Sequence, residues 1–298
     1  MEKVTLSFLG TGNAVPTKKR NHTAILLNYK DQSLLFDCGE GTQRQFKFLG
    51  ISATKLTKLF ITHWHGDHIL GIPGLFQTLA MLNYNKTLEV YGPKKTKYYL
   101  ELMSELFKDL KIKFKVKEIE SAILDFGDFK IESRPMKHNT PSNAYSFIIK
   151  DKLRLDKAKL KKLKIPNSPL IKQLQQGKDI IINGKKIKSS SVTYKEKGKK
   201  ITIILDTLMN PETIDLAKNS DILICESTFS EKDKEKAREY WHLTAKQAAE
   251  IAKKAKCKSL ILTHISERYE NALFLIEKEA KKIFKNTTIA KDLYSFEI

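Results

Sequence analysis

The stretch Thr62–His68 (THWHGDH, residues 62–68) places three of the chain's seven histidines and one aspartate within six positions. It directly follows a short apolar run that is typical of a β-strand. Alternation of side chains places His63 and His65 on one side and turns Asp67 and His68 to the other. This pattern predicts half of a two-metal site, whose remaining ligands must come from elsewhere in the chain.

Three further strand-like runs end in a side chain that can bind a metal: FKIESRPMK at His138, ITIIL at Asp206 and SLILT at His264. Because strand ends in layered α/β folds gather at one edge, we expect these side chains to join the first cluster. Imidazole and carboxylate without thiolate suit catalytic Zn²⁺, and a carboxylate is the natural bridge between two ions. The predicted metal ligands are His63, His65, Asp67, His68, His138, Asp206 and His264.

The bulk composition is that of a folded globular protein, with 298 residues, 41% hydrophobic and 9% aromatic. The sequence contains no run of about 18 apolar residues, the length that would predict a transmembrane helix. The first residues lack the pattern of a secretory signal. Three widely spaced cysteines indicate reduced thiols. We therefore expect a cytoplasmic protein with no membrane partner.

The charge predicts a polyanionic partner. The chain has 54 Lys and Arg against 34 Asp and Glu, a net charge of +20. A general lysine bias is an alternative cause, but residues 150–200 hold 17 basic and 4 acidic residues and thus 13 of the net charges. Within them, residues 151–180 carry Lys and Leu at near-helical spacing. We interpret 151–180 as a projecting basic arm inserted in a single domain spanning 1–298, with a solvated lysine-rich insertion as the alternative.

The remaining pattern predicts two sheets covered by helices in an α/β sandwich. The predicted strands are 4–8, 23–27, 33–36, 58–61, 88–90, 114–118, 129–134, 145–149, 201–205, 222–225 and 259–262. The predicted helices are 73–82, 96–108, 210–218, 231–240, 244–255 and 270–283.

Several motifs together resemble the tRNase Z family, in its short form, of the metallo-β-lactamase superfamily. They are FLGTGNAVPTKKRN, LLFDCGEGTQRQ, FITHWHGDHILGIPGL, ICESTF and HLTAKQAAEIAKKA leading to LILTHISERY. The resemblance covers nearly the whole chain in the expected order. It implies an αββα sandwich of the metallo-β-lactamase type and a zinc-dependent endoribonuclease that removes the 3′ trailer of precursor tRNA, leaving a 3′-hydroxyl. It also implies a homodimer in which the arm of one subunit serves the other.

The resemblance assigns roles to individual residues. His63, His65 and His138 would hold one Zn²⁺, and Asp67, His68 and His264 the other, with Asp206 bridging; Mn²⁺ is a possible substitute. Asp67 would orient the attacking water, and Glu226 and His242 would protonate the leaving oxygen. Cys225, Leu243 and Ser168-Pro169 depart from the family pattern without removing any of these groups.

The predicted substrate contacts are basic. They comprise Lys18, Lys19, Arg20, Arg268 and the arm lysines Lys157, Lys159, Lys161, Lys162 and Lys164. A solvated surface role is the alternative for each of them singly. His22 is expected to be a solvated loop residue, and Trp64 has no predicted task.

Two other functions compete with this interpretation. One is a hydrolase of small phosphodiesters or esters with the same fold, and the other is a catalytically silent RNA-binding relative. The basic arm and the aspartate bridge favour the nuclease over the first, and the complete ligand set favours it over the second.

Overall fold

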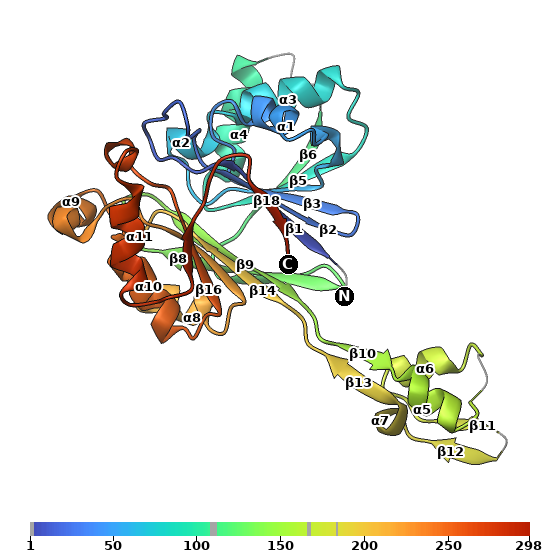
Figure 1. Ribbon diagram of the computed structural model, residues 1–298. Coiled ribbons are helices and arrows are strands. Elements are labelled where there is room, and N and C mark those ends of the chain that lie inside the picture. Colours follow the sequence, from blue (N-terminus) through green and yellow to red (C-terminus); the bar gives the residue numbers. More distant parts are fainter. Residues whose placement is uncertain (1–2, 108–111, 166–167, 183) are drawn as a thin grey trace.

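The computed structural model describes residues 3–107, 112–165, 168–182 and 184–298. Two seven-stranded sheets pack face to face, and each is covered by helices on its outer side (Figure 1). The predicted αββα sandwich is therefore confirmed.

In the first sheet, the first four strands in spatial order pair antiparallel with one another, and the fourth to the seventh pair parallel. In spatial order its strands are β18 (Ser295–Glu297), β1 (Val4–Gly10), β2 (Ala24–Tyr29), β3 (Gln32–Phe36), β4 (Lys58–Phe60), β5 (Thr87–Gly92) and β6 (Lys113–Glu118). The helices on its outer face are α1 (Thr42–Phe48), α3 (Ile72–Met81) and α4 (Thr96–Leu106).

The second sheet has the same number of strands. In spatial order they are β17 (Thr287–Ile289), β16 (Ser259–Thr263), β15 (Ile222–Glu226), β14 (Lys200–Ile204), β9 (Ser142–Ile149), β8 (Phe129–Met136) and β7 (Ala122–Asp125). Its outer face is covered by α8 (Pro211–Ala217), α10 (Ala245–Lys254) and α11 (Leu273–Lys281). None of the helices in the described part of the chain is long and apolar enough to cross a lipid bilayer.

The alternation of side chains explains why both faces of each sheet are buried. In β15, Ile222 and Ile224 point into the core between the sheets, while Leu223 and Cys225 pack under the outer helices. Cys225 and Leu243, two departures from the family pattern, are thus fully buried members of that outer cluster. Both fill the core between sheet and helices.

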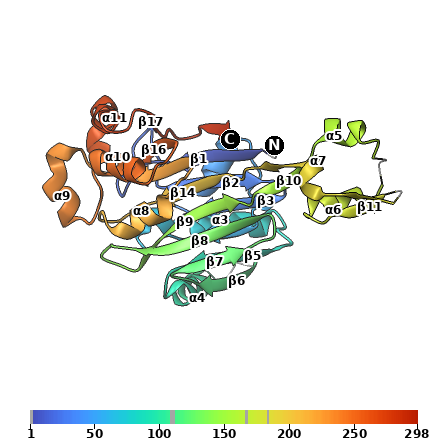
Figure 2. The same cartoon turned by 90° about the horizontal axis from the view of Figure 1, so that it is seen from below.

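A two-stranded ribbon carries the arm away from the sandwich (Figures 1 and 2). The ribbon pairs β10 (Lys152–Leu155) with β13 (Thr193–Glu196). The elements between them are α5 (Lys157–Lys162), α6 (Ile171–Gln175), β11 (Ile180–Ile182), β12 (Lys185–Ile187) and α7 (Ser189–Val192). They enclose a small core of their own around Leu174, Ile180 and Val192.

The arm extends beyond the predicted limit of residue 180. The reason is physical: a chain that leaves along β10 must return beside it, and the returning strand β13 ends at Glu196. Residues 166 and 167 of the predicted range lie outside the described residues. Ser168-Pro169 lies at the start of α6 within the arm, since the Ile171 N–H donates to the Ser168 carbonyl at 3.1 Å.

The arm is rooted at the amino end of the parallel strands. The chain enters it from the end of β9 at Ile149 and returns at Lys200, the first residue of β14. Gly198 allows the two segments to pass closely, because a Cβ there would lie 1.8 Å from the Ile149 carbonyl oxygen. The carboxyl ends of the same strands lie at the opposite edge of the sheet.

Candidate metal centre and catalytic site

The carboxyl ends of parallel strands position the candidate site. Strands β14, β15 and β16 run parallel, and they lead directly to Asp206, Glu226 and His264. In the same sheet β8 runs toward His138, and in the other sheet β4 leads to His63. Residues far apart in sequence therefore meet at one edge, as the sequence analysis predicts.

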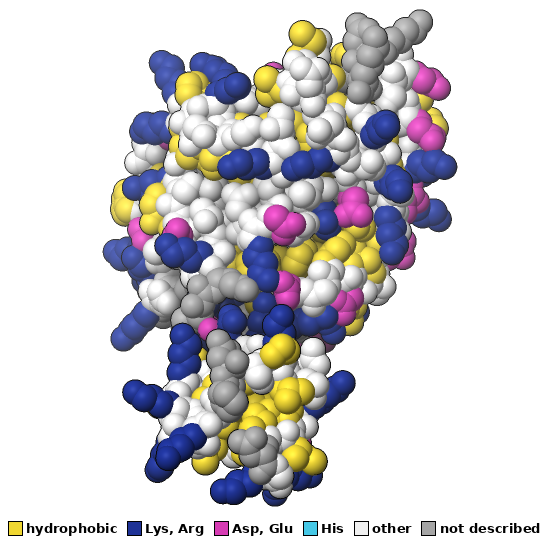
Figure 3. All heavy atoms as spheres, turned by 90° about the vertical axis from the view of Figure 1, so that its right-hand side faces the viewer, with side chains coloured by type: hydrophobic (Ala, Val, Ile, Leu, Met, Phe, Trp, Pro, Cys, Tyr) yellow, Lys and Arg dark blue, Asp and Glu magenta, His cyan; other side chains and the backbone are white. Residues whose placement is uncertain are grey.

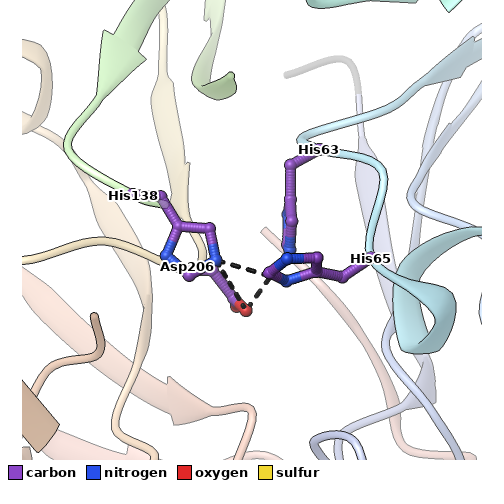
Figure 4. A group of neighbouring side chains, drawn as sticks. All are labelled: His63, His65, His138 and Asp206. Carbon is purple, nitrogen blue, oxygen red and sulfur yellow. Dashed lines mark hydrogen bonds and ion pairs between the residues drawn. The ribbon is translucent and has the colours of Figure 1, made fainter. Parts of the chain in front are cut away.

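One group of potential ligands consists of His63, His65, His138 and Asp206 (Figure 4). Their ligand atoms all lie within 4.8 Å of one another. The Nε2 atom of His138 is 3.3 Å from the Nδ1 atom of His65. The Nε2 atom of His63 is 3.4 Å from the Oδ2 atom of Asp206. Three imidazoles and one carboxylate therefore converge on a single point.

A second group consists of Asp67, His68 and His264, again with ligand atoms within 4.8 Å of one another. The Nε2 atoms of the two histidines are 3.1 Å apart, and that of His264 is 3.2 Å from the Oδ2 atom of Asp67. The Oδ1 atom of Asp206 lies 3.4 Å from His68 Nε2 and 3.2 Å from His264 Nε2. The Asp206 carboxylate therefore faces both groups, one oxygen to each.

The residues present fit a pair of divalent cations. Buried polar atoms normally have a hydrogen-bond partner, but His63 Nε2 and Asp206 Oδ1 have none. Both atoms face into the cluster, where imidazole nitrogens and carboxylate oxygens converge. Because a bound cation would satisfy these atoms at once, the donor set suits a metal of the zinc type.

In His68, His138 and His264, the Nδ1 atom, which faces away from the cluster, has a hydrogen-bond partner of its own. The Nδ1–H group of His68 donates to Asp37 at 2.6 Å, and that of His138 donates to the Trp241 carbonyl at 3.1 Å. The Nδ1 atom of His264 lies 2.9 Å from the Thr228 hydroxyl. Such outer contacts fix the tautomer and the orientation of a metal ligand.

Asp37 is a functional residue that the sequence analysis missed. Its buried carboxylate accepts hydrogen bonds from the backbone N–H and the hydroxyl of Thr62, both at 2.7 Å, in addition to His68. The signal was present, because Asp37 directly follows β3 just as Asp206 and His264 follow their strands. Asp37 and His264 both adopt left-handed backbone conformations, with φ of 57° and 56°. Strain of this kind is typical of functional sites.

Glu226 and His242 form a second functional unit beside the cluster. The Nδ1 atom of His242 lies 3.1 Å from the Oε2 atom of the fully buried Glu226. Glu226 also accepts hydrogen bonds from the Thr207 N–H at 2.7 Å and from the Thr228 hydroxyl at 2.6 Å. Since Thr228 in turn accepts from His264, one carboxylate orients both His242 and the hydroxyl behind a ligand.

Electrostatics favour the charged forms of His242 and Asp206. Burial alone would lower the pKa of His242, but Glu226 and Asp206 outweigh it and raise the pKa to about 9. Burial would raise the pKa of Asp206, but the surrounding imidazoles, His264 and His68 first, hold the pKa of its carboxyl well below the usual range. Asp206 is therefore an ionised carboxylate, the form that binds cations.

The predicted substrate contacts divide into exposed and buried residues. Lys18 and Lys19 are exposed, as a phosphate contact requires. The Arg20 guanidinium, in contrast, is buried and donates to the Thr11 hydroxyl at 2.6 Å and the Ala290 carbonyl at 2.9 Å. The structure thus contradicts the predicted role of Arg20 as a substrate contact, because the buried side chain fastens its own loop.

The other predicted basic residues are accessible to solvent. The side chain of Arg268 is 36% exposed, and its guanidinium lies 5.1 Å from the ring centre of Phe229. All five predicted arm lysines are exposed; they are Lys157, Lys159, Lys161, Lys162 and Lys164.

Two aromatic side chains have structural roles that the sequence did not indicate. The prediction of a solvated His22 is wrong: the residue is buried, and its Nε2–H group donates to the Ala14 carbonyl at 3.2 Å. Trp64 fastens the metal-binding loop to α4, because its Nε1–H group donates to Thr96 at 3.0 Å and its ring packs 4.9 Å from that of Tyr99.

Proteins named ribonuclease Z match the chain over nearly its whole length. It is 42% identical over 287 residues to the ribonuclease Z of Nanoarchaeum equitans, which covers 96% of this chain and 90% of that protein. It is 39% identical to the ribonuclease Z of Bacillus cereus over 98% of each chain. The family model described as Anti-Pycsar protein Apyc1 matches residues 4–163. That match ends within the arm, before Asp206, Glu226, His242 and His264.

Solved structures agree with these matches. The short form of human tRNase Z superposes with a TM-score of 0.70 at 26% identity, over 98% of both chains. The metallo-β-lactamase fold protein YhfI of Bacillus subtilis superposes with a TM-score of 0.73 at 20% identity over the full length of both, which supports the fold alone. Because sequence matches at about 40% identity span both sheets, the chain belongs to the ribonuclease Z family.

Proposed function

We propose that the chain is a metal-dependent endoribonuclease that removes the 3′ trailer of precursor tRNA and leaves a 3′-hydroxyl on the tRNA. The observation that carries this proposal is the buried Glu226–His242 pair beside a seven-ligand cluster in a member of the ribonuclease Z family. We further propose two Zn²⁺ ions per subunit, with Mn²⁺ as a possible substitute. The two ligand groups that share Asp206 support this number.

The ligand assignment follows the two groups. His63, His65 and His138 would hold one ion, and Asp67, His68 and His264 the other, with Asp206 between them. Bound divalent cations supply Lewis-acid polarisation of the scissile phosphate and lower the pKa of an attacking water.

The chain's own residues perform the proton transfers in this proposal. Asp67 is positioned to orient the attacking water and to accept its proton, because its carboxylate lies at the cluster beside His264. His242 is held by Glu226 and lies 3.8 Å from Asp206, so it can donate a proton to the leaving 3′ oxygen. Attack and departure then occur on opposite sides of the phosphorus.

The arm is proposed to hold the tRNA body. Lys and Arg side chains project along the edges of the arm on the face seen in Figure 3. Contacts of such side chains with phosphates are independent of sequence and sensitive to salt. Strand β14 begins at the arm root, at Lys200, and runs roughly 16 Å away from the arm over its five residues; Asp206 lies two residues beyond its end. Because the arm points away from its own site, we propose a homodimer in which it serves the partner's site.

A hydrolase of small phosphodiesters is the competing function, and the match of residues 4–163 to another family is compatible with it. The basic arm supports the nuclease, since a small substrate has no use for it. A cytoplasmic location remains a prediction, supported by three buried cysteines that are all free thiols.

Incubation with precursor tRNA tests the function directly. We expect a single cut after the discriminator nucleotide or near an encoded CCA, a 3′-hydroxyl on the tRNA product, and complete loss of activity in a chelator. End mapping of both products measures this. Intact precursor tRNA, together with rapid hydrolysis of a small phosphodiester by the same metal-replete preparation, would contradict the proposal.

Replacement of His242 by alanine tests the proton donor. We expect kcat for precursor tRNA to fall by about 10²- to 10⁴-fold, the range typical of a lost general acid, with bound metal unchanged. The matched measurement uses bis(4-nitrophenyl) phosphate, whose leaving group needs no proton and whose hydrolysis should be nearly unaffected. Equal losses on both substrates would show that His242 does not act as a proton donor.

A further inference from the structure

The chain has two tryptophans, and each directly adjoins a histidine of the site. Trp64 lies between His63 and His65, and Trp241 precedes His242. Trp64 has a hydrogen bond to Thr96 and a ring partner, as described above. Its indole is therefore fully used within the fold.

Trp241 differs from Trp64 in its surroundings. Its side chain is half-buried, yet its indole has no hydrogen-bond, ring or hydrophobic-cluster partner among residues of the described ranges. Its backbone is fully used, because the Trp241 carbonyl accepts from His138 and the Trp241 N–H donates to the Arg238 carbonyl at 3.3 Å. The backbone of Trp241 thus lies against His138, one of the potential metal ligands, and directly precedes His242.

The backbone conformation of Trp241 adds to this contrast. Its φ is 62°, a left-handed value that favours glycine or asparagine and is an outlier for a bulky residue. The turn after α9 (Lys234–Glu239) would accept a small residue at lower cost. The strained backbone conformation holds a large aromatic side chain that has no partner among the described residues. This indicates that the side chain binds something other than the protein itself.

The neighbouring surface is aromatic and basic. Tyr240 is 55% exposed, and its ring lies nearly parallel to that of Phe229, with centres 6.3 Å apart. Phe229 is buried, 6.0 Å from the ring of His242, and the Arg268 guanidinium lies over it, 4.0 Å from the Asp233 carboxylate. Exposed aromatic rings beside cationic side chains are how proteins bind unpaired nucleotides, through base stacking and phosphate contacts.

We propose that Trp241, assisted by Tyr240, stacks on the base of the last nucleotide retained on the tRNA. This inference rests on the proposed function. The proton of His242 goes to the 3′ oxygen of that nucleotide, so its sugar and base must lie beside His242, where the two aromatic residues are. Trp241 is then a binding residue for the nucleotide on the 5′ side of the cut, and Arg268 faces the phosphate of the same unpaired segment.

A cycle of enzyme and substrate changes tests the stacking. The substrates are precursor tRNA and the same RNA with an abasic residue at the last retained position. We expect Trp241→Ala to lower kcat/KM on the intact substrate by about 10-fold or more, the order of one lost stacking contact. The abasic substrate should lower the wild-type value by a similar factor. Because both changes remove the same contact, the variant should lose no more than about 2-fold further on the abasic substrate.

Two variants serve as controls. Trp241→Tyr keeps an aromatic ring and should recover most of the lost activity. Tyr98→Ala removes a tyrosine of α4 that is as exposed as Tyr240, at 55%, and should leave kcat/KM unchanged. Losses that multiply across the cycle, or a Trp241→Ala enzyme that cleaves normally, would overturn the stacking role. Failure of the wild type to cleave precursor tRNA would instead overturn the proposed function itself.

Fluorescence provides a readout that is independent of turnover. In a Trp64→Phe variant Trp241 is the sole tryptophan, so binding of mature tRNA that ends at the last retained nucleotide should quench its emission. The same tRNA with a terminal abasic residue should quench it less. A Trp241→Phe variant, which keeps only Trp64, should show little change with either probe. Equal quenching in both variants would exclude a specific contact with Trp241.

Discussion

Asp206→Ala is expected to lower the rate of precursor tRNA cleavage by more than about 1,000-fold, above the loss usual for one electrostatic contact in an active site. Asp206 is the residue whose carboxylate faces both ligand groups, at 3.4 Å from His63 on one side and 3.2 Å from His264 on the other. Its removal would take a ligand from each of the two proposed ions and leave neighbouring imidazoles without a counter-charge. Metal content by elemental analysis should fall in parallel with activity.

Asp37→Asn is the matched control, because it alters another buried aspartate at the same edge. Asp37 touches a single ligand, His68, from behind. Its substitution should weaken metal binding by about 10- to 100-fold, the range of outer contacts, and excess metal should restore much of the activity. An Asp206→Ala enzyme that retains both metals and cleaves normally would refute the shared-carboxylate arrangement.

Deletion of the arm is expected to reduce cleavage of precursor tRNA by about 100-fold or more, because the lost lysines are proposed to contact phosphates. Hydrolysis of bis(4-nitrophenyl) phosphate should persist, since the metal cluster lies at the opposite edge. The deletion is feasible because the ends of the arm adjoin: Lys152 pairs with Glu196, and the Gly198 N–H donates to the Asp151 carboxylate at 2.7 Å. A short linker in place of residues 152–196 would close the gap.

Mixing this deletion variant with full-length Asp206→Ala tests whether the arm acts on the partner. Neither protein is active alone, but a mixed dimer has one intact site served by one intact arm. Random exchange of subunits should restore about a quarter of wild-type activity in a two-fold symmetric dimer. An Asp206→Ala protein whose five arm lysines are also changed to alanine should restore none. Mixed dimers without activity would contradict the proposed homodimer.

Much of the fold could be predicted because the central strands are continuous apolar runs. Each of the eleven predicted strands overlaps an observed one. The strands missed in the sandwich are β7, β17 and β18, which are three or four residues long and lie at sheet edges. Short edge strands have little apolar pattern, since only part of their surface is buried. Their pairing is decided by the sheet they join.

The clustering of the potential metal ligands was predictable for a related reason. Strand ends deliver side chains to one edge, and the chemistry of His63, Asp206 and His264 then indicates a metal. Arg20 and His22 were not predictable, because long-range contacts bury the loop that contains them. Gly12 pairs with Ile265, and the Asn21 N–H donates to Asp292 at 2.6 Å. No local pattern reveals that a basic loop is fastened to residues some 250 positions away.

The root of the arm, at the edge opposite the metal cluster, has a consequence for how a substrate would be chosen. In the proposed homodimer the span from one subunit's arm to the other's cluster is set by two rigid sandwiches. The pair would then act as a ruler that measures a length along a folded RNA. Any RNA whose compact body presents a single-stranded 3′ end at that length meets the same requirement, whatever its sequence.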